Sequence, residues 1–260
     1  MVVFFDIDGT IIDEQTQQIP ESTLRAVEQL RENGHFPVVN TGRPYTHIDP
    51  RVREMAFSGW VCGCGMEVLL DGRWLVRKMP SAQVCKVVRD AVRQCNMQVL
   101  YEAQEAAVYT DGDLSVHPEI VREYSQMAER GIVVKDLDEE NPIFMKMITY
   151  DWENSRREEF LRKIEPIYTC IDRGNTMVEM VLKGHSKAAG MQRLLEELGV
   201  SGEEALAIGD STNDLPMFSV ARHTVCMGNG MQQLKDRAEF ITDSVCNDGI
   251  EKALRHFHLL

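Results

Sequence analysis

The chain has 260 residues, and its 28 Lys+Arg against 41 Asp+Glu give a formal net charge of −13, which makes nucleic acid an unfavourable partner. A hydrophobic content of 43% suffices for one or two buried cores and excludes a disordered chain. No apolar run approaches the roughly 18 residues of a membrane span, and the start Met1-Val2-Val3-Phe4-Phe5-Asp6 lacks the basic region of a signal peptide, so we expect a cytoplasmic protein that makes no membrane contact.

Strands and helices alternate at the start of the chain. Val2 to Phe5 is apolar without alternation, which is typical of a strand covered on both faces. A helix is predicted over 21–33, with Gly34 placed to end it, and a second strand over 36–39. The order strand, helix, strand indicates a right-handed crossover in a doubly wound parallel sheet. The remaining elements expected before Pro80 are a third strand near Val61 and a hairpin over 68–76 with an Asp71-Gly72 turn.

The pattern changes between Ser81 and Lys183 and then returns. Helices and paired strands in the middle of the chain favour a separate α+β module with a largely antiparallel sheet, with helices near 84–92, 118 and 155 and strands near 99, 108, 133, 147, 167–171 and 177–182. After Gly184 helices over 187–198, 213–220, 231–238 and 249–256 alternate with strands over 205–208 and 223–225. The expected fold is therefore α/β, a Rossmann-like doubly wound core formed by residues 1–80 and 184–260 and interrupted by an inserted α+β domain over 81–183.

Two aspartates follow the first strand in Asp6-Ile7-Asp8-Gly9-Thr10. Extended geometry sends Asp6 and Asp8 to the same side of the chain, and ligands of open α/β sheets bind at the carboxyl ends of strands. Taken alone, the motif could equally be a surface Asp-Gly turn.

Three further polar motifs follow predicted strands or begin a helix. Thr41-Gly42-Arg43-Pro44 follows the second strand, and Gly209-Asp210-Ser211-Thr212-Asn213-Asp214 follows the strand over 205–208. Lys187 falls in the first turn of a helix, where the dipole disfavours a cation unless a carboxylate or anion lies beside it. Each has a simpler interpretation, namely a loop, a helix cap and a solvated lysine. Together they fall at one edge of the expected sheet, so their side chains should converge.

The chemistry of the combined set indicates a cation and an anion. Asp6, Asp8, Asp210 and Asp214 would repel one another and any phosphate, and such a cluster is typical of a site for a hard divalent cation such as Mg²⁺. Lys187 and the donors at Thr41, Gly42 and Asn213 would then hold a phosphoryl group.

These four motifs resemble those of the haloacid dehalogenase-like superfamily, and within it the Cof-type sugar-phosphate phosphatases that carry a type IIB cap. Asp6-x-Asp8-Gly9-Thr10 is similar to the first motif, Thr41-Gly42-Arg43-Pro44 to the second, Lys187 to the third, and Gly209-Asp210-x-x-Asn213-Asp214 to the fourth. The resemblance also covers Met227-Gly228-Asn229 and Asn247-Asp248-Gly249-Ile250. One departure is Cys64, which stands where the group commonly has Asn.

The resemblance implies a role for each matched residue. Asp6 would be the nucleophile that becomes an aspartyl phosphate, and Asp8 the general acid and base. Mg²⁺ would bind the Asp6 and Asp210 carboxylates and the Asp8 main-chain carbonyl, with Asp214 as a ligand or in the outer shell. The residues implied in phosphoryl binding are Thr41, Gly42, Lys187 and Asn213, and Arg43 is expected to reach the substrate or the cap.

The expected function is a magnesium-dependent phosphatase of small phosphorylated metabolites, with sugar phosphates as the first candidates. A phosphomutase or phosphotransferase would use the same motifs, and a non-catalytic phosphosugar-binding regulator would be expected to lack Asp6, Asp8 or Lys187, all of which are present. A dehalogenase would need neither Asp8 nor a metal-binding cluster. Cys62-x-Cys64 has no further Cys or His at metal-ligand spacing, so we interpret it as a pair of buried thiols.

Overall fold

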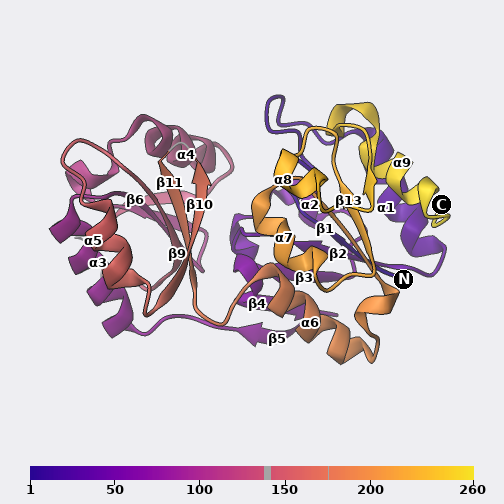
Figure 1. Cartoon of the computed structure of the whole chain (residues 1–260), viewed down its shortest axis with the longest axis horizontal. Coiled ribbons are helices and arrows are strands. Elements are labelled where there is room, and N and C mark those ends of the chain that lie inside the picture. Colours follow the sequence, from indigo (N-terminus) through magenta and orange to yellow (C-terminus); the bar gives the residue numbers. More distant parts are fainter. Residues whose placement is uncertain (138–141, 175) are drawn as a thin grey trace. The chain divides into compact units, whose positions relative to one another are not determined.

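The protein folds into two compact units (Figure 1), seen in a computed structural model that describes residues 1–137, 142–174 and 176–260. The first unit comprises Met1–Gly42, Pro50–Arg77 and His185–Leu260, and the second comprises Arg43–Asp49 and Lys78–Gly184. The mixed α/β fold with a parallel-sheet core confirms the expected fold class. Within the described ranges, no helix combines the length and apolar character needed to cross a bilayer.

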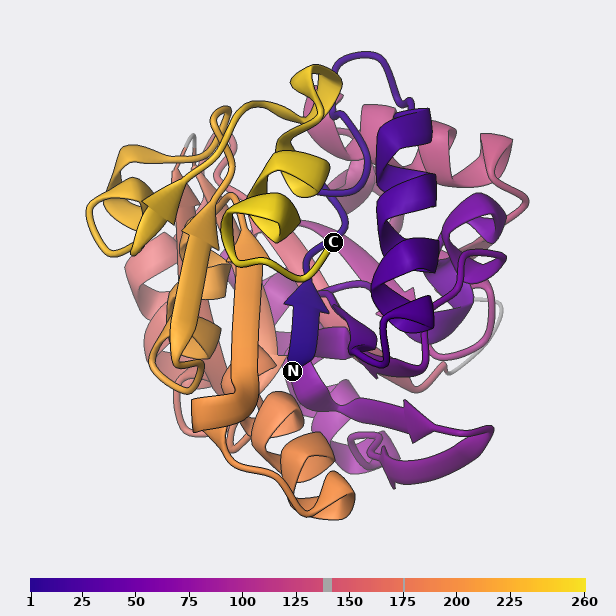
Figure 2. The same cartoon turned by 90° about the vertical axis from the view of Figure 1, so that its right-hand side faces the viewer.

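The first unit is built on a sheet with the order β14-β13-β12-β1-β2-β3-β4-β5. β1 is central and fully buried, as its unbroken apolar sequence requires, and it pairs in parallel with β12 and β2 (Figure 2). β4 and β5 form the expected hairpin and are antiparallel. The strands are β1 Val2–Phe5, β2 Phe36–Asn40, β3 Gly59–Cys62, β4 Glu67–Leu70, β5 Arg73–Arg77, β12 Ala205–Gly209, β13 His223–Cys226 and β14 Phe240–Ile241.

Helices flank this sheet. α1 and α9 pack side by side (Figure 2), and α6 packs against β2, β3 and β4. The helices are α1 Glu21–Glu32, α2 Pro50–Arg53, α6 Lys187–Leu198, α7 Leu215–Phe218, α8 Gln232–Lys235 and α9 Gly249–His256. The predictions over 213–220 and 231–238 were too long. The first segment begins with a 3₁₀ turn over Thr212–Asp214, and α7 and α8 each span only 4 residues.

The position of α6 depends on two glycines. Gly190, the fourth residue of the helix, faces Gly65 in the turn after β3, and a Cβ on Gly190 would lie 2.8 Å from the Gly65 Cα and would collide with the Val61 side chain. The two backbones can approach this closely only because neither residue carries a side chain. This contact fixes the helix that carries Lys187 at its first position.

We therefore expect Gly190→Ala to destabilise the protein, although alanine is the better helix former. Overpacking of this kind costs about 1–3 kcal/mol, and the melting temperature should fall by about 2–4 °C for each kcal/mol in a chain of this size. Gln192→Ala, an exposed change in the same helix, is the matched control. An equal or higher melting temperature for Gly190→Ala, measured by calorimetry, would contradict this account.

The second unit is an α+β module with the strand order β10-β11-β9-β6-β7-β8, antiparallel apart from the β7–β8 pair. α3 and α5 pack together on one side of the sheet, and α4 packs on the other against β6 and β8 (Figure 1). Its elements are α3 Ala82–Cys95, β6 Gln98–Ala103, β7 Ala107–Thr110, α4 Pro118–Glu129, β8 Val133–Asp136, β9 Phe144–Tyr150, α5 Arg157–Ile164, β10 Tyr168–Gly174 and β11 Met177–Leu182.

The short segment 43–49 belongs to the second unit although it lies between two parts of the first unit in the sequence. The Thr46 hydroxyl donates a hydrogen bond to the Gln104 carbonyl oxygen at 2.6 Å, and the His47 ring nitrogen Nε2 lies 3.3 Å from the Glu105 carbonyl oxygen. These contacts attach the segment to the loop after β6.

Candidate active site

The candidate site lies at the carboxyl ends of neighbouring parallel strands of the first unit. Asp6 follows β1 directly, and Asp210 follows β12, its neighbour in the sheet. The Asp6 backbone N–H extends the pairing by donating to the Ile208 carbonyl oxygen at 3.0 Å. Strand register therefore brings two acidic motifs together that are about two hundred positions apart in the sequence.

Lys187 is buried between two carboxylates. Its ammonium nitrogen Nζ lies 2.7 Å from Asp6 Oδ1 and 2.6 Å from Asp214 Oδ1, and only 1% of its side chain is exposed. Burial by itself lowers the pKa of Lys187, but the Asp214 and Asp6 carboxylates outweigh burial and raise it, so the side chain is charged. These two partners offset the unfavourable placement of a cation at the start of α6.

Asp214 is a positioning residue in this arrangement. It is fully buried, and its Oδ2 accepts hydrogen bonds from the Asp210 and Ser211 backbone N–H groups, both at 3.0 Å, while its Oδ1 faces Lys187. It therefore closes a capping box over the turn that carries Asp210. With both oxygens engaged, Asp214 holds the Asp210 loop and the Lys187 ammonium in place.

Asp6, Asp210 and Asp214 each offer a carboxylate oxygen within 4.8 Å of the other two. Burial raises the pKa of Asp6 to about 7 against the opposing effect of Lys187, with further increases from Asp214 and Asp8. Burial, and after it the Asp6 and Asp214 charges, raises the pKa of Asp210 to about 9. Asp210 Oδ1 is buried and has no hydrogen-bond partner among the described residues. A hard divalent cation would satisfy this oxygen and offset the repulsion, so the donor set fits such an ion.

Gly9 makes room for Asp210. Its φ of +74° lies in the left-handed region, and a Cβ at this position would collide with the Asp210 carboxylate. The glycine of the first motif thus permits the acidic loop after β12 to approach the loop after β1.

The raised pKa values predict how the metal-free protein responds to pH. Between the ordinary aspartate pKa of 3.8 and the native values of about 7 and 9, the folded state binds more protons than the unfolded state, so stability falls as pH rises. In chelator we expect Asp210→Asn to weaken this fall and to raise the melting temperature near pH 8 by about 2–4 °C, the shift that about 1 kcal/mol produces.

Thermal scans at pH 5 to 8, with chelator and with Mg²⁺, measure this effect. Mg²⁺ should stabilise the unsubstituted protein more than the Asp210→Asn variant, because the ion favours the ionised carboxylates. Glu28→Gln, which removes one exposed charge from α1, is the control for the change in net charge. Equal stabilisation of both proteins by Mg²⁺ would place the cation elsewhere.

The remaining residues that the sequence predicts for the site are Asp8, Thr41, Gly42, Arg43 and Asn213, and they differ in burial and in the unit to which they belong. Asp8 is half-buried in the tight turn after β1 and close enough to raise the pKa of Asp6. Thr41 is buried after β2, where its N–H donates to the Val61 carbonyl oxygen at 2.8 Å. Asn213 Oδ1 accepts from the Ser211 hydroxyl at 3.0 Å. Gly42 ends a segment of the first unit, whereas Arg43 begins the segment that belongs to the second unit.

Two asparagines that sequence analysis did not assign support the site. Asn40 ends β2 fully buried, and its Nδ2 donates to the Lys187 carbonyl oxygen at 3.1 Å. Asn229 donates to the Gly9 carbonyl oxygen at 2.7 Å and accepts from the Val245 N–H at 3.2 Å. The available signal for Asn40 was a polar residue at the end of an otherwise apolar strand.

Cys64 occupies a left-handed backbone position. Its φ is +52°, a conformation that Asn tolerates better than most residues, and its N–H donates to the Thr41 carbonyl oxygen at 3.1 Å. Its backbone therefore supports the second motif. Both Cys62 and Cys64 are buried, and burial raises the pKa of the Cys62 thiol.

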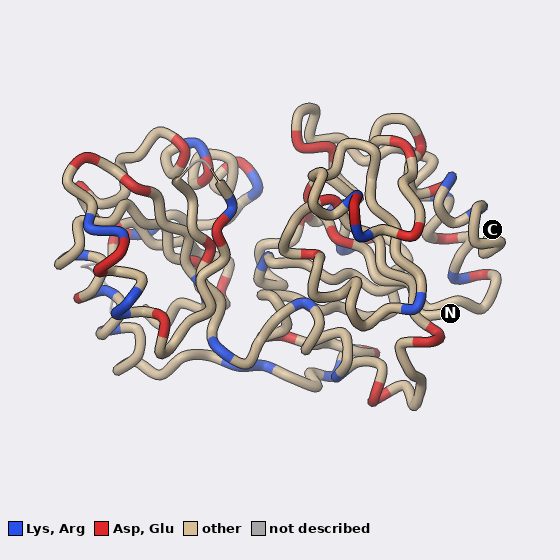
Figure 3. Tube along the Cα trace, in the orientation of Figure 1, with Lys and Arg blue, Asp and Glu red and all other residues tan. Residues whose placement is uncertain are grey.

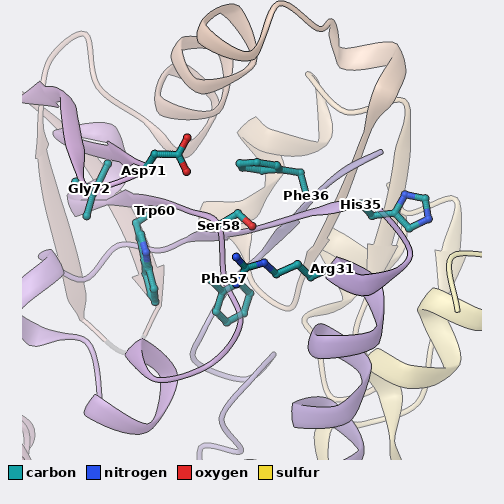
Figure 4. Close-up of a pocket in the computed structure, with 10 residues that line it drawn as sticks. Arg31, His35, Phe36, Phe57, Ser58, Trp60, Asp71 and Gly72 are labelled. Atoms are coloured by element: carbon teal, nitrogen blue, oxygen red, sulfur yellow. The ribbon is translucent and has the colours of Figure 1, made fainter.

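A cavity of about 430 Å³ lies beside the amino ends of strands β2 and β3, opposite the end of the sheet that carries the candidate site (Figure 4). Phe36, which begins β2, and Phe57 and Trp60, on either side of the start of β3, line it together with Arg31 and Asp71. Asp6 and Asp210 lie instead at the carboxyl ends of β1 and β12. The cavity is therefore separate from the candidate active site.

A family model for haloacid dehalogenase-like hydrolases matches residues 3–254, and the chain belongs to this family. The resemblance noted in the motifs is thereby confirmed. The chain is 26% identical to the putative phosphatase YkrA of Bacillus subtilis, over 100% of this chain and 98% of that protein. It is 25% identical to the 5-amino-6-(5-phospho-D-ribitylamino)uracil phosphatase YcsE of the same organism, over 99% of this chain and 96% of that protein. The structure of BT1666 from Bacteroides thetaiotaomicron, described as a phosphatase of the same superfamily, matches with a TM-score of 0.83 and 25% identity, over 100% of this chain and 95% of that one.

Proposed function

We propose that the protein is a magnesium-dependent phosphatase that hydrolyses small phosphorylated metabolites through an aspartyl phosphate at Asp6. The observation that carries this proposal is the buried Lys187 ammonium held between Asp6 and Asp214 beside the Asp210 carboxylate. A transferring phosphoryl group needs a nucleophile and compensation of its negative charge. One carboxylate can serve as the nucleophile, Lys187 supplies part of the compensation, and the acidic cluster would hold a divalent cation that supplies the rest.

In the first half of the reaction, the Asp6 carboxylate attacks phosphorus and the bond from phosphorus to the ester oxygen breaks. Lys187 orients Asp6 through Oδ1 and remains charged, so it can also stabilise the phosphoryl oxygens. Asp8 donates a proton to the departing alkoxide. Thr41, Gly42 and Asn213 are assigned to the phosphoryl group as hydrogen-bond donors.

In the second half, Asp8 takes a proton from a water molecule, which attacks the aspartyl phosphate and releases inorganic phosphate and free Asp6. Asp6, Asp210 and the Asp8 main-chain carbonyl would hold Mg²⁺, and Asp214 would orient this set from outside it. The ion, when bound, compensates the charge of the phosphoryl group.

The substrates are assigned to sugar phosphates and related small phosphate esters. The relative YcsE is named for a substrate in which a ribityl chain carries the phosphate, which supports a polyhydroxylated leaving group. Acidic and basic positions are interspersed along the trace of both units (Figure 3), and acidic residues outnumber basic ones by 41 to 28, which disfavours nucleic acid. Residues 1–80 and 184–260 are proposed as the catalytic core, and residues 81–183 as the cap that selects the leaving group.

A screen of phosphorylated sugars, nucleotides and cofactors tests the proposal, with inorganic phosphate measured in Mg²⁺ and in excess chelator. Phosphate release without a sugar acceptor distinguishes hydrolysis from a mutase reaction. We expect release that requires Mg²⁺ and is lost in chelator. Full activity in excess chelator, or no phosphate release from any compound, would overturn the proposal.

A further inference from the structure

A row of five charged or titratable side chains crosses the second unit. Glu102 on β6 pairs directly with Lys146 on β9, and the Lys146 ammonium lies 3.1 Å from Glu102 and 2.6 Å from Glu179 on β11. The two ends are His47, whose Nδ1 is 4.0 Å from Glu102, and Arg173, whose Nε is 4.0 Å from Glu179. We call His47, Glu102, Lys146, Glu179 and Arg173 the polar row.

The polar row is buried at a substantial cost in desolvation. Glu102, Lys146 and Glu179 are 2%, 5% and 4% exposed, and removing such charges from water costs several kcal/mol per ion before pairing compensates. Apolar residues of the same sheet face, Leu100 and Ile148, pack into a hydrophobic cluster instead. Stability alone therefore does not account for ions at these positions.

His47 leaves a hydrogen-bond acceptor at one end of the row. It is 2% exposed, and burial, the largest effect, lowers its pKa, so the ring is neutral near pH 7. Because Nε2 faces the Glu105 carbonyl oxygen, which only accepts, we place the proton on Nε2 and the lone pair on Nδ1. Nδ1 has no hydrogen-bond partner among the described residues, and the nearby Glu102 carboxylate is also an acceptor.

Arg173 leaves a donor at the other end. Its Nη1 is buried and has no hydrogen-bond partner within the part of the chain that the structure describes. The row thus requires a group that donates at His47 and a group that accepts at Arg173. Hydroxyl groups do both, whereas a phosphate oxygen only accepts and would face two glutamates.

We propose that the polar row binds hydroxyl groups spaced along a polyol or sugar. Two glutamates balance one lysine and one arginine, so the row suits a neutral polyhydroxylated chain better than a second phosphate or an aromatic base. The proposal rests on the proposed phosphatase function, in which such a chain would be the leaving group. Within the polar row, His47, Glu102 and Arg173 are the residues assigned to recognition of this leaving group.

The test compares two substrates that differ in the leaving group, ribitol 5-phosphate and p-nitrophenyl phosphate. The readout is the ratio of kcat/KM for the first to kcat/KM for the second. We expect His47→Phe to lower this ratio about fivefold or more, because it removes a neutral hydrogen bond. We expect Glu102→Gln to lower it about tenfold or more, because hydrogen bonds to charged groups are stronger. Tyr168→Phe, which removes a buried hydroxyl on the opposite face of the sheet, is the matched control and should leave the ratio unchanged.

Direct binding separates this inference from the proposed function. Saturation-transfer NMR with millimolar ribitol should show contact with the full-length protein and a weaker signal with His47→Phe. An unchanged ratio in folded variants, absence of ribitol contact, or a preference for fructose 1,6-bisphosphate over ribitol 5-phosphate would overturn the inference even if hydrolysis depends on Asp6. Hydrolysis that survives Asp6→Asn would overturn the proposed function instead, whatever the ratio.

Discussion

Asp6→Asn is expected to lower kcat by at least about 10⁴-fold with every substrate, because an amide of the same shape cannot serve as the nucleophile. The fold should survive, since Lys187 keeps Asp214 as an ionic partner at 2.6 Å and the substitution removes one of the mutually repelling carboxylates. Circular dichroism and the melting temperature report on the fold, and steady-state phosphate release reports on the reaction.

The covalent step is checked by trapping. Labelled phosphate from a substrate quenched in acid should appear on Asp6 in the unsubstituted protein and be absent from Asp6→Asn. Asp13→Asn, a nearby change in a turn whose carboxylate caps the Thr16 N–H, should retain both the label and the activity. Label on a histidine or serine would show that the nucleophile has been misassigned.

Asp8→Asn is expected to distinguish the role of Asp8 as proton donor from the role of Asp6 as nucleophile. A positioned proton donor contributes about 10² to 10⁴ in rate, and its contribution is largest when the departing oxygen is strongly basic. The variant should therefore form the phospho-enzyme very slowly from a sugar phosphate and much less slowly from p-nitrophenyl phosphate, whose leaving group needs no proton. Asp6→Asn should abolish phospho-enzyme formation from both.

This difference must be measured on the first step alone. Because Asp8 should also activate water, slow hydrolysis of the phospho-enzyme could dominate steady-state turnover with either substrate and conceal the effect. A rapid-quench burst isolates phosphoryl transfer to Asp6. Equal losses of burst rate for the two leaving groups would show that Asp8 acts chiefly by organising the turn after β1.

Sequence reasoning found the acidic loops because each follows a strand, and parallel strands that are neighbours in the sheet place such loops together. Lys187 was informative because it lies at the start of a helix, where a cation requires a partner, and the structure places two carboxylates there. The sequence could not predict which aspartate has a structural role and which is open to a cation. Asp214 caps two N–H groups, while Asp210 keeps an oxygen that has no hydrogen-bond partner in the described parts of the chain, and this difference follows from loop conformation.

Other features were missed for different reasons. β14 spans only 2 residues, too few to show any periodicity. The polar row combines residues from strands β6, β9, β10 and β11 with one from the segment 43–49, and only strand register makes them neighbours. Nothing in the sequence distinguishes Glu102 or Lys146, because charged residues make up 27% of the chain.

The assignment of residues 43–49 to the second unit bears on how this domain could be exchanged between relatives. A graft of residues 81–183 alone would join a foreign loop after β6 to the native Thr46 and His47, whose partners are the carbonyl oxygens of Gln104 and Glu105. The transferable module is therefore discontinuous and consists of residues 43–49 together with 78–184. Exchange of one continuous stretch either separates the two segments or, if it runs from 43 to 184, also replaces residues 50–77 of the first unit. A chimera that transfers this module alone therefore has to replace both segments and keep the stretch between them.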